Sequence, residues 1–392
     1  MQRNLGAILC FVIFLYGCDR DADQPARPWV WRLDGNELYS PALSADGSRV
    51  LVVAKRHEPD GHEAETLMRG DPQAFLNERT AELQANPRIK DPRIMLIDLS
   101  SRVARELDYG WSPTFSPDES SIAYAHQKNA ISGFRVLAKT LEGNDIRTLD
   151  LASGAKAIVA TPLRGYLAEP TYSPSGHELA YALSGPADGA YGGNLGVEAT
   201  NLVTREARTL SPRILELGLP RLILQFGYLG PQLHAIEATP VSPDQYLPDH
   251  YRVDLVRLSP DRSVVATWGV LDYSLAWSRR FASAQNGVLL IFDGAWHEPS
   301  AACAARAHQS LPQNPGVHSP DGRWIARASE TNIVLIDAST DSVVATWESD
   351  RSTEALTWSA NSTHFAWIAV GESEPFKFDS LVVVEVAHGS AR

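Results

Sequence analysis

Apolar residues stand at alternate positions in several short stretches of the chain, and a polar turn directly precedes each stretch. Alternation with a period of two predicts strands that bury one face. A tight turn joined to such a strand predicts a β-hairpin. The apolar pairs that define these strands are Val50 and Val52, Ile122 and Tyr124, Leu179 and Tyr181, and Phe365 and Trp367, with Ile325 in a further copy.

The turns are copies of one phrase, in which an aromatic or apolar residue is followed by Ser, usually Pro, and a turn pair. Asp or Asn can bond its own backbone in such a turn, and Gly accepts a positive φ. A repeated supersecondary unit determines the architecture before any single residue does. The copies are Leu43-Ser44-Ala45-Asp46-Gly47, Phe115-Ser116-Pro117-Asp118-Glu119, Tyr172-Ser173-Pro174-Ser175-Gly176, His318-Ser319-Pro320-Asp321-Gly322 and Trp358-Ser359-Ala360-Asn361-Ser362.

A second hairpin follows within each repeat, so four strands per repeat are expected. Its first strand reads Ile94–Leu99, Ile146–Leu151 and Ile333–Asp337. One partner strand recurs without change, because Val264–Trp268 and Val343–Trp347 have the same five residues. The turn Ser259-Pro260-Asp261 precedes the first of these copies and is therefore predicted to lie inside a repeat, not at its start.

The repeated turn and the strand after it resemble the TolB-like (WD40-like) family of β-propeller repeats, most closely from Ser319 to Ile325. The resemblance implies an all-β fold of four-stranded antiparallel blades. A blade takes about 40 residues, which fits the spacing from Ser319 to Ser359 but not the longer spacings before Ser173. With degenerate copies at 226–237 and 275–285, around Trp277-Ser278, the expected number is seven blades; six or eight stay open because 287–316 has no clear pattern.

The two ends of the repeat region predict how the ring closes. The last repeat has Leu381–Val386 but no fourth strand, whereas Trp29–Leu33 is a strand without a partner. Adding this N-terminal strand to the final blade removes an exposed sheet edge. We therefore expect the propeller to span 28–392, closed by its N-terminal strand.

Residues 1–17 are predicted to be a signal peptide, since the apolar run Leu5–Leu15 is too short for a permanent membrane helix. The run ends in Leu15-Tyr16-Gly17-Cys18, which resembles the bacterial lipoprotein box. This implies lipidation of Cys18, a short tether at 18–27, and a protein anchored by lipid in the envelope, on the periplasmic side. Asp19 resembles an inner-membrane retention signal, but inner and outer membrane both stay open. The alternative is a plain signal peptide with an incidental cysteine.

Charge and cysteine content limit the possible partners. The chain of 392 residues carries a formal charge of -12 and has no dense basic run, which argues against nucleic acid as a partner. After Cys10 and Cys18, only Cys303 remains, so no disulfide is expected within the mature chain. Cys303 is interpreted as a small packed residue.

Three segments depart from the repeat, at about 56–92, 184–196 and 240–250, and loops on a rigid scaffold are where binding usually lies. Asp71–Gln84 in the first is predicted to be helical. The cluster His57–Glu65 contains two imidazoles and four carboxylates, but its spacing matches no metal site, so we interpret it as a solvated acidic loop.

The sequence contains no recognisable catalytic constellation. Peptidases with propellers need a separate hydrolase domain with a Gly-x-Ser-x-Gly elbow, and this pentapeptide does not occur. His318 takes the position of the aromatic or apolar residue before the turn, so it is predicted to pack there, with a role in the central channel as the alternative. Trp111, Trp277, Trp358 and Trp367 are predicted to pack between sheets, with carbohydrate stacking as the alternative, whereas the packing explanation does not cover Trp296.

These observations predict no catalytic residue, no cofactor and no metal site, and they favour a noncatalytic envelope lipoprotein. Its propeller would serve as an interaction platform for an envelope protein or a cell-wall glycan. The alternative is a propeller enzyme of the polysaccharide lyase or hydrolase type with a site at the central channel. Three or more His, Glu, Arg or Lys side chains meeting at one channel mouth would favour that enzyme.

Overall fold

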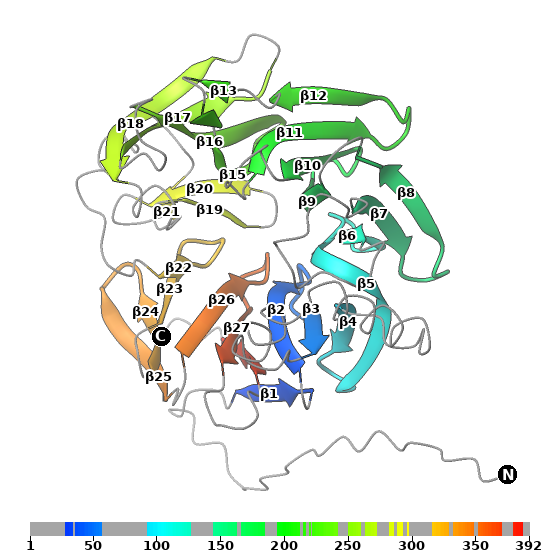
Figure 1. Cartoon of the computed structure of the whole chain (residues 1–392). Coiled ribbons are helices and arrows are strands. Elements are labelled where there is room, and N and C mark those ends of the chain that lie inside the picture. The colour runs from blue at the N-terminus through cyan, green and yellow to red at the C-terminus, as the bar shows by residue number, and fades with distance from the viewer. Residues whose placement is uncertain are drawn as a thin grey trace, which may run out of the picture.

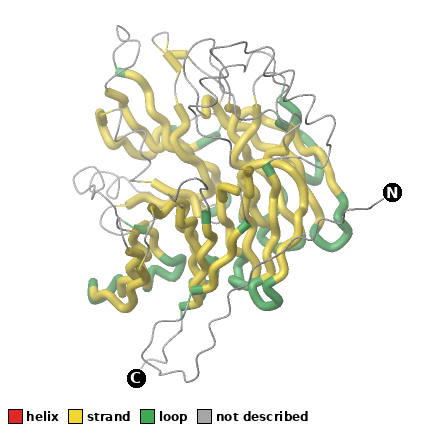
Figure 2. Tube along the Cα trace, turned by 60° about the horizontal axis from the view of Figure 1, so that its bottom comes forward, coloured by secondary structure: helices red, strands yellow, loops and turns green. Residues whose placement is uncertain are grey.

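The computed structural model describes the greater part of the chain, with strands throughout and no helix in the described part. Figure 2 shows these strands running side by side through the molecule. The described residues are 28–33, 36–56, 92–126, 144–162, 166–184, 194–211, 215–216, 219–220, 222–241, 250–259, 263–272, 282–285, 288–292, 296–297, 316–328, 332–348, 352–370 and 379–386.

The strands pair with their neighbours in sequence to form antiparallel blades, each named here by one of its strands. The β2 blade contains β2 (Asn36–Leu43), β3 (Arg49–Arg56), β4 (Arg93–Asp98) and the first half of β5 (Val103–Phe115). The β6 blade contains the second half of β5, β6 (Ser121–His126), β7 (Asp145–Asp150) and β8 (Lys156–Ala160). The β9 blade contains β9 (Tyr166–Tyr172), β10 (Glu178–Ser184), β11 (Asn194–Asn201) and β12 (Ala207–Ser211).

The remaining blades follow the same plan. The β15 blade contains β15 (Leu222–Leu229), β16 (Gln232–Pro240), β17 (His250–Arg257) and β18 (Val264–Asp272). The β22 blade contains β22 (Val317–His318), β23 (Trp324–Ala328), β24 (Asn332–Asp337) and β25 (Ser342–Glu348). The β26 blade contains β26 (Ser352–Trp358), β27 (His364–Val370), β28 (Ser380–Glu385) and β1 (Trp29–Arg32).

Between the β15 and β22 blades lie β19 (Ala282–Gln285), β20 (Val288–Phe292) and β21 (Trp296–His297), which form a set of three strands. A two-stranded ribbon, β13 (Leu215–Glu216) and β14 (Leu219–Pro220), precedes β15. The described strands thus give six four-stranded blades and one three-stranded set. Seven complete blades stay a prediction, because much of the chain from β18 to β22 lies outside the described residues.

The blades are arranged around a common axis as in a β-propeller, which confirms the expected fold class (Figure 1). First strands such as β2, β9, β15 and β26 lie nearest the centre, and fourth strands such as β8, β12, β18 and β25 lie at the rim. The two copies of the shared pentapeptide lie in the fourth strands β18 and β25. Ser259 lies between the third and fourth strands of its blade, inside the repeat as predicted.

The N-terminal strand closes the ring, as the sequence predicts. β1 pairs antiparallel with β28, from Trp29 opposite Val383 to Arg32 opposite Ser380. The Arg32 Nε donates a hydrogen bond to the Ser380 Oγ at 2.7 Å. The last blade therefore has four strands, of which the outermost comes from the other end of the chain.

The core consists of apolar layers between adjacent blades. Trp347 of the β22 blade packs edge-on against Phe365 of the β26 blade at 5.4 Å, and Phe365 stacks on Trp367 at 5.5 Å between ring centroids. Trp358 lies 5.0 Å from the same Phe365 ring. Burying aromatic side chains in this way contributes about 1.5 to 3 kcal/mol each. Trp358 and Trp367 are buried as predicted.

The alternation of strand direction gives the propeller two different ends. One, the turn end, carries the first-to-second-strand turns 44–48, 116–120, 173–177, 319–323 and 359–363, together with the third-to-fourth-strand turns. The other, the insertion end, carries the second-to-third-strand connections. Within the described residues, no helix is long and apolar enough to cross a membrane.

Candidate functional site

The repeated turn is held by the same hydrogen bonds in each blade that carries it. In the β2 blade the Ser44 hydroxyl donates to Asp46 at 2.6 Å, and the Arg49 amide donates back to Ser44 Oγ at 2.9 Å. The Asp46 carboxylate accepts a further bond from the Ser48 amide at 2.9 Å. Ser and Asp in the phrase are therefore explained as turn-forming residues, as the sequence suggests.

The fourth position of the turn has a left-handed backbone in all five copies. Gly occupies it at Gly47, Gly176 and Gly322, where φ lies between 72° and 75°. Glu119 and Ser362 take the same conformation, with φ of 56° and 62°. A side chain at this φ is unfavourable, so these two residues need a compensating interaction, and both have one with a neighbouring blade.

Hydrogen bonds link the turns of adjacent blades at the turn end. The Asn361 amide donates to the Ala45 carbonyl at 2.9 Å, and the Asn361 side chain donates to the Asp46 carbonyl at 3.0 Å. The Asp321 amide donates to Ser362 Oγ at 3.0 Å. Glu119 accepts a hydrogen bond from the Ala45 amide and pairs with Arg49 at 2.7 Å. These bridges join the β22, β26, β2 and β6 blades in sequence.

The next junction, between the β6 and β9 blades, lacks the corresponding bridge in the described residues. The residue equivalent to Ala45 is Pro117, which has no amide hydrogen to donate. The residue equivalent to Glu119 is Gly176, which has no side chain that could accept a hydrogen bond. A Cβ built on Gly176 would lie 3.7 Å from Pro117, so the two turns touch without a polar bridge.

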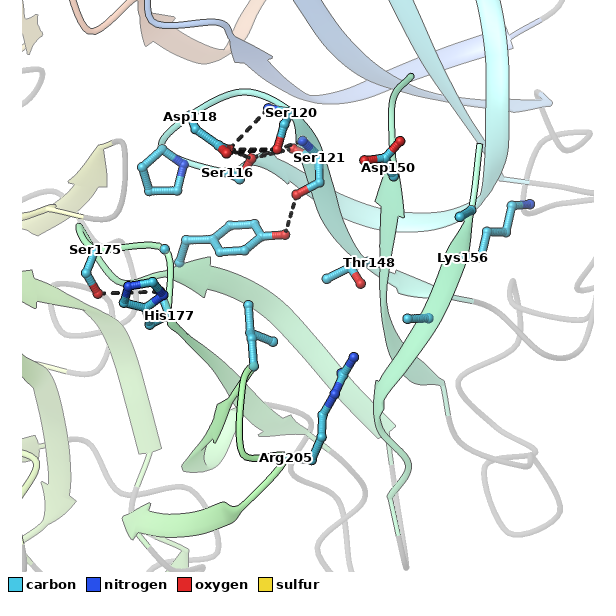
Figure 3. Close-up of a pocket in the computed structure, with 16 residues that line it drawn as sticks. Ser116, Asp118, Ser120, Ser121, Thr148, Asp150, Lys156, Ser175, His177 and Arg205 are labelled. Atoms are coloured by element: carbon cyan, nitrogen blue, oxygen red, sulfur yellow. Dashed lines mark hydrogen bonds between the residues drawn. The ribbon is translucent and has the colours of Figure 1, made fainter. Parts of the chain in front are cut away.

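The open junction contains a hollow of about 470 Å³. Its polar lining includes Asp118, Asp150, Thr148 and Arg205, which Figure 3 shows around one space, with Arg205 extending toward Thr148. The Lys156 side chain points away from this space (Figure 3). Its apolar lining includes Ala155, Ala157, Leu202 and the ring of Tyr172.

Electrostatics fix the protonation of the groups in the hollow at neutral pH. Hydrogen bonds from Ser116 and Ser120 lower the pKa of Asp118, and bonds from Ser153 lower that of Asp150. Burial raises the pKa of Tyr172 to about 12, although its hydroxyl lies 3.3 Å from Ser121 Oγ. The hollow thus offers charged acceptors, neutral hydroxyls and the Arg205 guanidinium.

Arg205 reaches the hollow from a second repeated turn, between the third and fourth strands. Its amide donates to the Asn201 carbonyl at 2.9 Å, and its φ of 63° is left-handed. The equivalent residues of the β2, β6 and β22 blades are Arg102, Gly154 and Asp341, all with positive φ. This position accepts Gly without a change of backbone.

A buried ionic cluster lies on the other side of the β6 blade. Asp108 is 4% exposed; its Oδ1 lies 2.9 Å from the Lys156 Nζ, and its other oxygen accepts the Tyr124 hydroxyl. Burial alone raises the pKa of Asp108, but the bonds from Tyr124 and Lys156 outweigh it, and the net pKa is lowered. Burial lowers the pKa of the adjacent His126. The cluster is a charged carboxylate held by donors from the next blade.

The first strands share an irregularity that the alternation of apolar residues does not predict. Ser40, Ser112 and Glu169 have left-handed backbones, with φ near 50°, at β-bulges in β2, β5 and β9. Each stands directly before a proline and four residues before the turn Ser. The X-Pro pair at this fixed spacing was the available signal.

The first strands lie nearest the central axis, so their side chains show whether acid and base groups meet there. Their acidic side chains include Glu37 and Glu169, but β2, β9, β15, β22 and β26 contain no Lys or Arg. Glu37 accepts a hydrogen bond from Tyr39 of its own strand. Across the described residues, no group of three or more His, Cys, Asp or Glu side chains could hold a metal ion. A mixed acid and base constellation is thus not found on these strands.

Several predicted residues can be located. His318 is 4% exposed, which confirms its packing position before the turn. Trp111 is half-buried and meets Tyr39 edge-on at 5.7 Å. Trp296 lies in β21. Cys18, Trp277, Cys303, His57–Glu65 and the expected helix Asp71–Gln84 lie outside the described residues.

The three predicted insertions also lie largely outside the described residues, but the strands that flank them are described. They connect β3 to β4, β10 to β11, and β16 to β17, which in every case are second and third strands. The middle segment is shorter than expected, because β11 begins at Asn194. All three therefore start and finish at the insertion end.

Sequence comparison finds no matching family model and no matching curated protein. Among solved structures, the chain is similar to the Myceliophteria thermophila Cps50 (Swd1) β-propeller domain, with 12% identity, 91% of this chain and 99% of that chain covered, and a TM-score of 0.51. TolB from Acinetobacter baumannii also matches, with 15% identity, 74% and 59% coverage, and a TM-score of 0.36.

An acylaminoacyl peptidase from Pyrococcus horikoshii matches with 10% identity, 88% and 50% coverage, and a TM-score of 0.49. This chain thus spans 59% of the length of TolB and half that of the peptidase. Together with the strand pairing, the match to the Swd1 domain confirms a β-propeller fold. At these identities the matches concern the fold alone.

Proposed function

We propose that this chain is a noncatalytic lipoprotein of the cell envelope whose propeller is a protein or glycan interaction platform, with its partner bound at the insertion end. The observation that carries the proposal is that all three insertions are anchored at one end of a rigid scaffold. Insertions gathered on one face of a repeat fold often form its binding face.

The register of β1 supports this assignment of the ends. Trp29 pairs with Val383, toward the turn end of β28, and Arg32 pairs with Ser380 at the insertion end. The chain therefore enters β1 from the turn end. Residues 18–27 can span at most about 35 Å. A lipid on Cys18 would hold the turn end near the membrane and leave the insertion end facing away from it.

The lipid anchor is tested by Cys18→Ser, with Cys303→Ser as the matched control. Wild type and Cys303→Ser should incorporate a radiolabelled fatty acid and sediment with membranes, because two or more acyl chains anchor a protein stably. Cys18→Ser should lose both properties. Unchanged labelling and sedimentation of Cys18→Ser would overturn the anchor and leave the propeller assignment intact.

The binding face is tested by photo-crosslinking in intact cells from two exposed valines. Val241 lies at the insertion end directly after β16, and Val343 lies at the turn end at the start of β25, in a blade that does not line the hollow. A photoreactive amino acid at 241 should give recurrent adducts with one envelope protein or glycan, identified by mass spectrometry, whereas one at 343 should not. Adducts from 343 alone, or none from either position, would contradict the proposed face.

A further inference from the structure

We propose that the hollow between the β6 and β9 blades is a binding site for a neutral saccharide unit. It lies at the turn end, lined by Thr148, Tyr172 and Arg205 among others. The hollow is separate from the insertion end and needs no lipid anchor, so this proposal does not depend on the proposed function.

The site exists because two turn positions differ from those of the neighbouring junction. At the junction of the β2 and β6 blades, Glu119 crosses to the Ala45 amide and to Arg49, so its side chain lies between the two turns. Pro117 and Gly176 take the equivalent positions one junction later and can make no such bridge. The same backbone therefore leaves a space at one junction and closes it at the other.

The polar groups around the hollow form a mixed set. Asp118 and Asp150 are charged acceptors at neutral pH, Arg205 supplies guanidinium donors, and Thr148 and Tyr172 carry hydroxyls that both donate and accept. A strongly anionic ligand would face two carboxylates, and a cationic ligand would face Arg205. A neutral polyhydroxyl compound satisfies both kinds of group, because each of its hydroxyls donates and accepts.

The size and the apolar lining agree with a sugar ring. The volume of about 470 Å³ lies within the range of small-molecule sites, about 300 to 1,000 Å³. Ala155, Ala157, Leu202 and the Tyr172 ring offer apolar surface beside the polar groups. A pyranose has the same division, with C–H groups on its faces and hydroxyls at its edge.

Arg205 is the residue whose removal tests the site most cleanly. The other lysine or arginine of the lining, Lys156, is paired with Asp108 and points away (Figure 3). Arg205→Gly keeps the turn, because Gly154 takes the equivalent position with φ of 72°. Arg102→Gly is the matched control, since Arg102 has the same turn position and a similar φ but does not line the hollow.

The experiment is saturation-transfer NMR and calorimetry on the full chain with three probes: chitotriose, maltotriose and the acidic trigalacturonate. We expect saturable binding of a neutral trisaccharide, weaker binding of trigalacturonate, and about tenfold loss of affinity in Arg205→Gly, because charge-assisted hydrogen bonds are lost. Gly176→Glu, which places a side chain at the open junction, should abolish binding while Arg205 remains. Arg102→Gly should bind as wild type does.

The outcomes distinguish saccharide binding in the hollow from binding elsewhere and from a general loss of the fold. No binding of any of the three probes would overturn the proposal, as would a preference for trigalacturonate. Binding that survives both Arg205→Gly and Gly176→Glu would place the saccharide elsewhere and also overturn it. An equal loss of saccharide affinity in Arg205→Gly and Arg102→Gly would mean that glycine in the turn, and not the loss of the Arg205 guanidinium, weakens binding. This result would overturn the role of Arg205. Urea denaturation of each variant checks that the fold is retained.

Discussion

The β6 blade meets its two neighbours in different ways. On one side, Glu119 crosses to the Ala45 amide and Arg49, and the buried Asp108 accepts bonds from Tyr124 and Lys156. On the other side, the Pro117 and Gly176 turns face each other without a polar bridge, the Ser121 and Tyr172 hydroxyls lie 3.3 Å apart, and a hollow of about 470 Å³ remains. The turn backbone is the same in both places. Whether a junction closes is therefore decided by single side chains at fixed positions of a repeat.

This comparison implies that stability is concentrated at the closed junctions, and the first test is Gly47→Ala at the junction of the β26 and β2 blades. A Cβ there would lie 2.1 Å from His364 Nδ1, which also lies 2.8 Å from Thr363 Oγ1, and the φ of 75° is unfavourable for Ala. We expect the free energy of unfolding to fall by about 3 kcal/mol, measured by urea denaturation.

Gly322→Ala is its matched control, at the same turn position with φ of 72° and nothing within 4 Å of the added Cβ. It should cost only the backbone strain, about 1 kcal/mol. An equal fall in the free energy of unfolding in the two variants would show that the close contact with His364 adds nothing to the cost. The tight packing at this junction would then not explain its stability.

The second test removes the buried charge between the β2 and β6 blades. Asp108→Asn should lower the free energy of unfolding at pH 7 by about 2 kcal/mol, because the Tyr124 and Lys156 bonds lose their charged acceptor. The folded-state pKa of Asp108 lies below the usual 3.8, so its contribution is present above that pH and is lost as the pH falls through the lower value.

The difference between Asp108→Asn and wild type should therefore narrow in urea titrations carried out below pH 3.8. Asp341→Asn, at an exposed turn, serves as the control and should change the free energy of unfolding by less than about 0.5 kcal/mol. A pH-independent difference for Asp108→Asn would mean that the lost interaction is steric, not ionic.

The smallest expected effect comes from restoring the missing proline of the turn phrase. Ala45→Pro removes the amide that Glu119 accepts from, and should lower the free energy of unfolding by about 1 kcal/mol. Ala360→Pro changes the equivalent residue of the β26 blade, whose amide donates no hydrogen bond within the described residues. It should raise the free energy of unfolding by up to about 0.5 kcal/mol, because proline lowers the conformational entropy of the unfolded chain. Similar changes in both variants would rule out a role for the Ala45 amide.

Much of the scaffold was predictable, because its strands repeat a local pattern. The alternation at Val50, Ile122, Leu179 and Phe365 correctly marks buried strands, and the unpartnered strand at Trp29 correctly predicts closure of the ring. These features depend on periodicity and on the need to cover sheet edges, and both can be read from the sequence alone.

The hollow could not be predicted in the same way, because it depends on which turns become neighbours in space. Pro117 and Gly176 both look like ordinary members of the turn phrase, and only their contact shows that a bridge is missing. The ionic cluster has the same origin, since Asp108 and Lys156 come from different blades. The sequence does show that Ala45 stands where most copies of the turn phrase have Pro. Only the structure shows the reason, which is that the Ala45 amide donates a hydrogen bond to Glu119.

The pairing of β1 with β28 also determines when the protein can finish folding. Arg32 and Ser380, which bond across these strands, are separated by 348 residues. Closing a loop of that length costs about 5 kcal/mol of chain entropy, and contacts so distant in sequence slow folding. The first strand to be synthesised must wait for the last, and until then an open sheet edge is available to other chains.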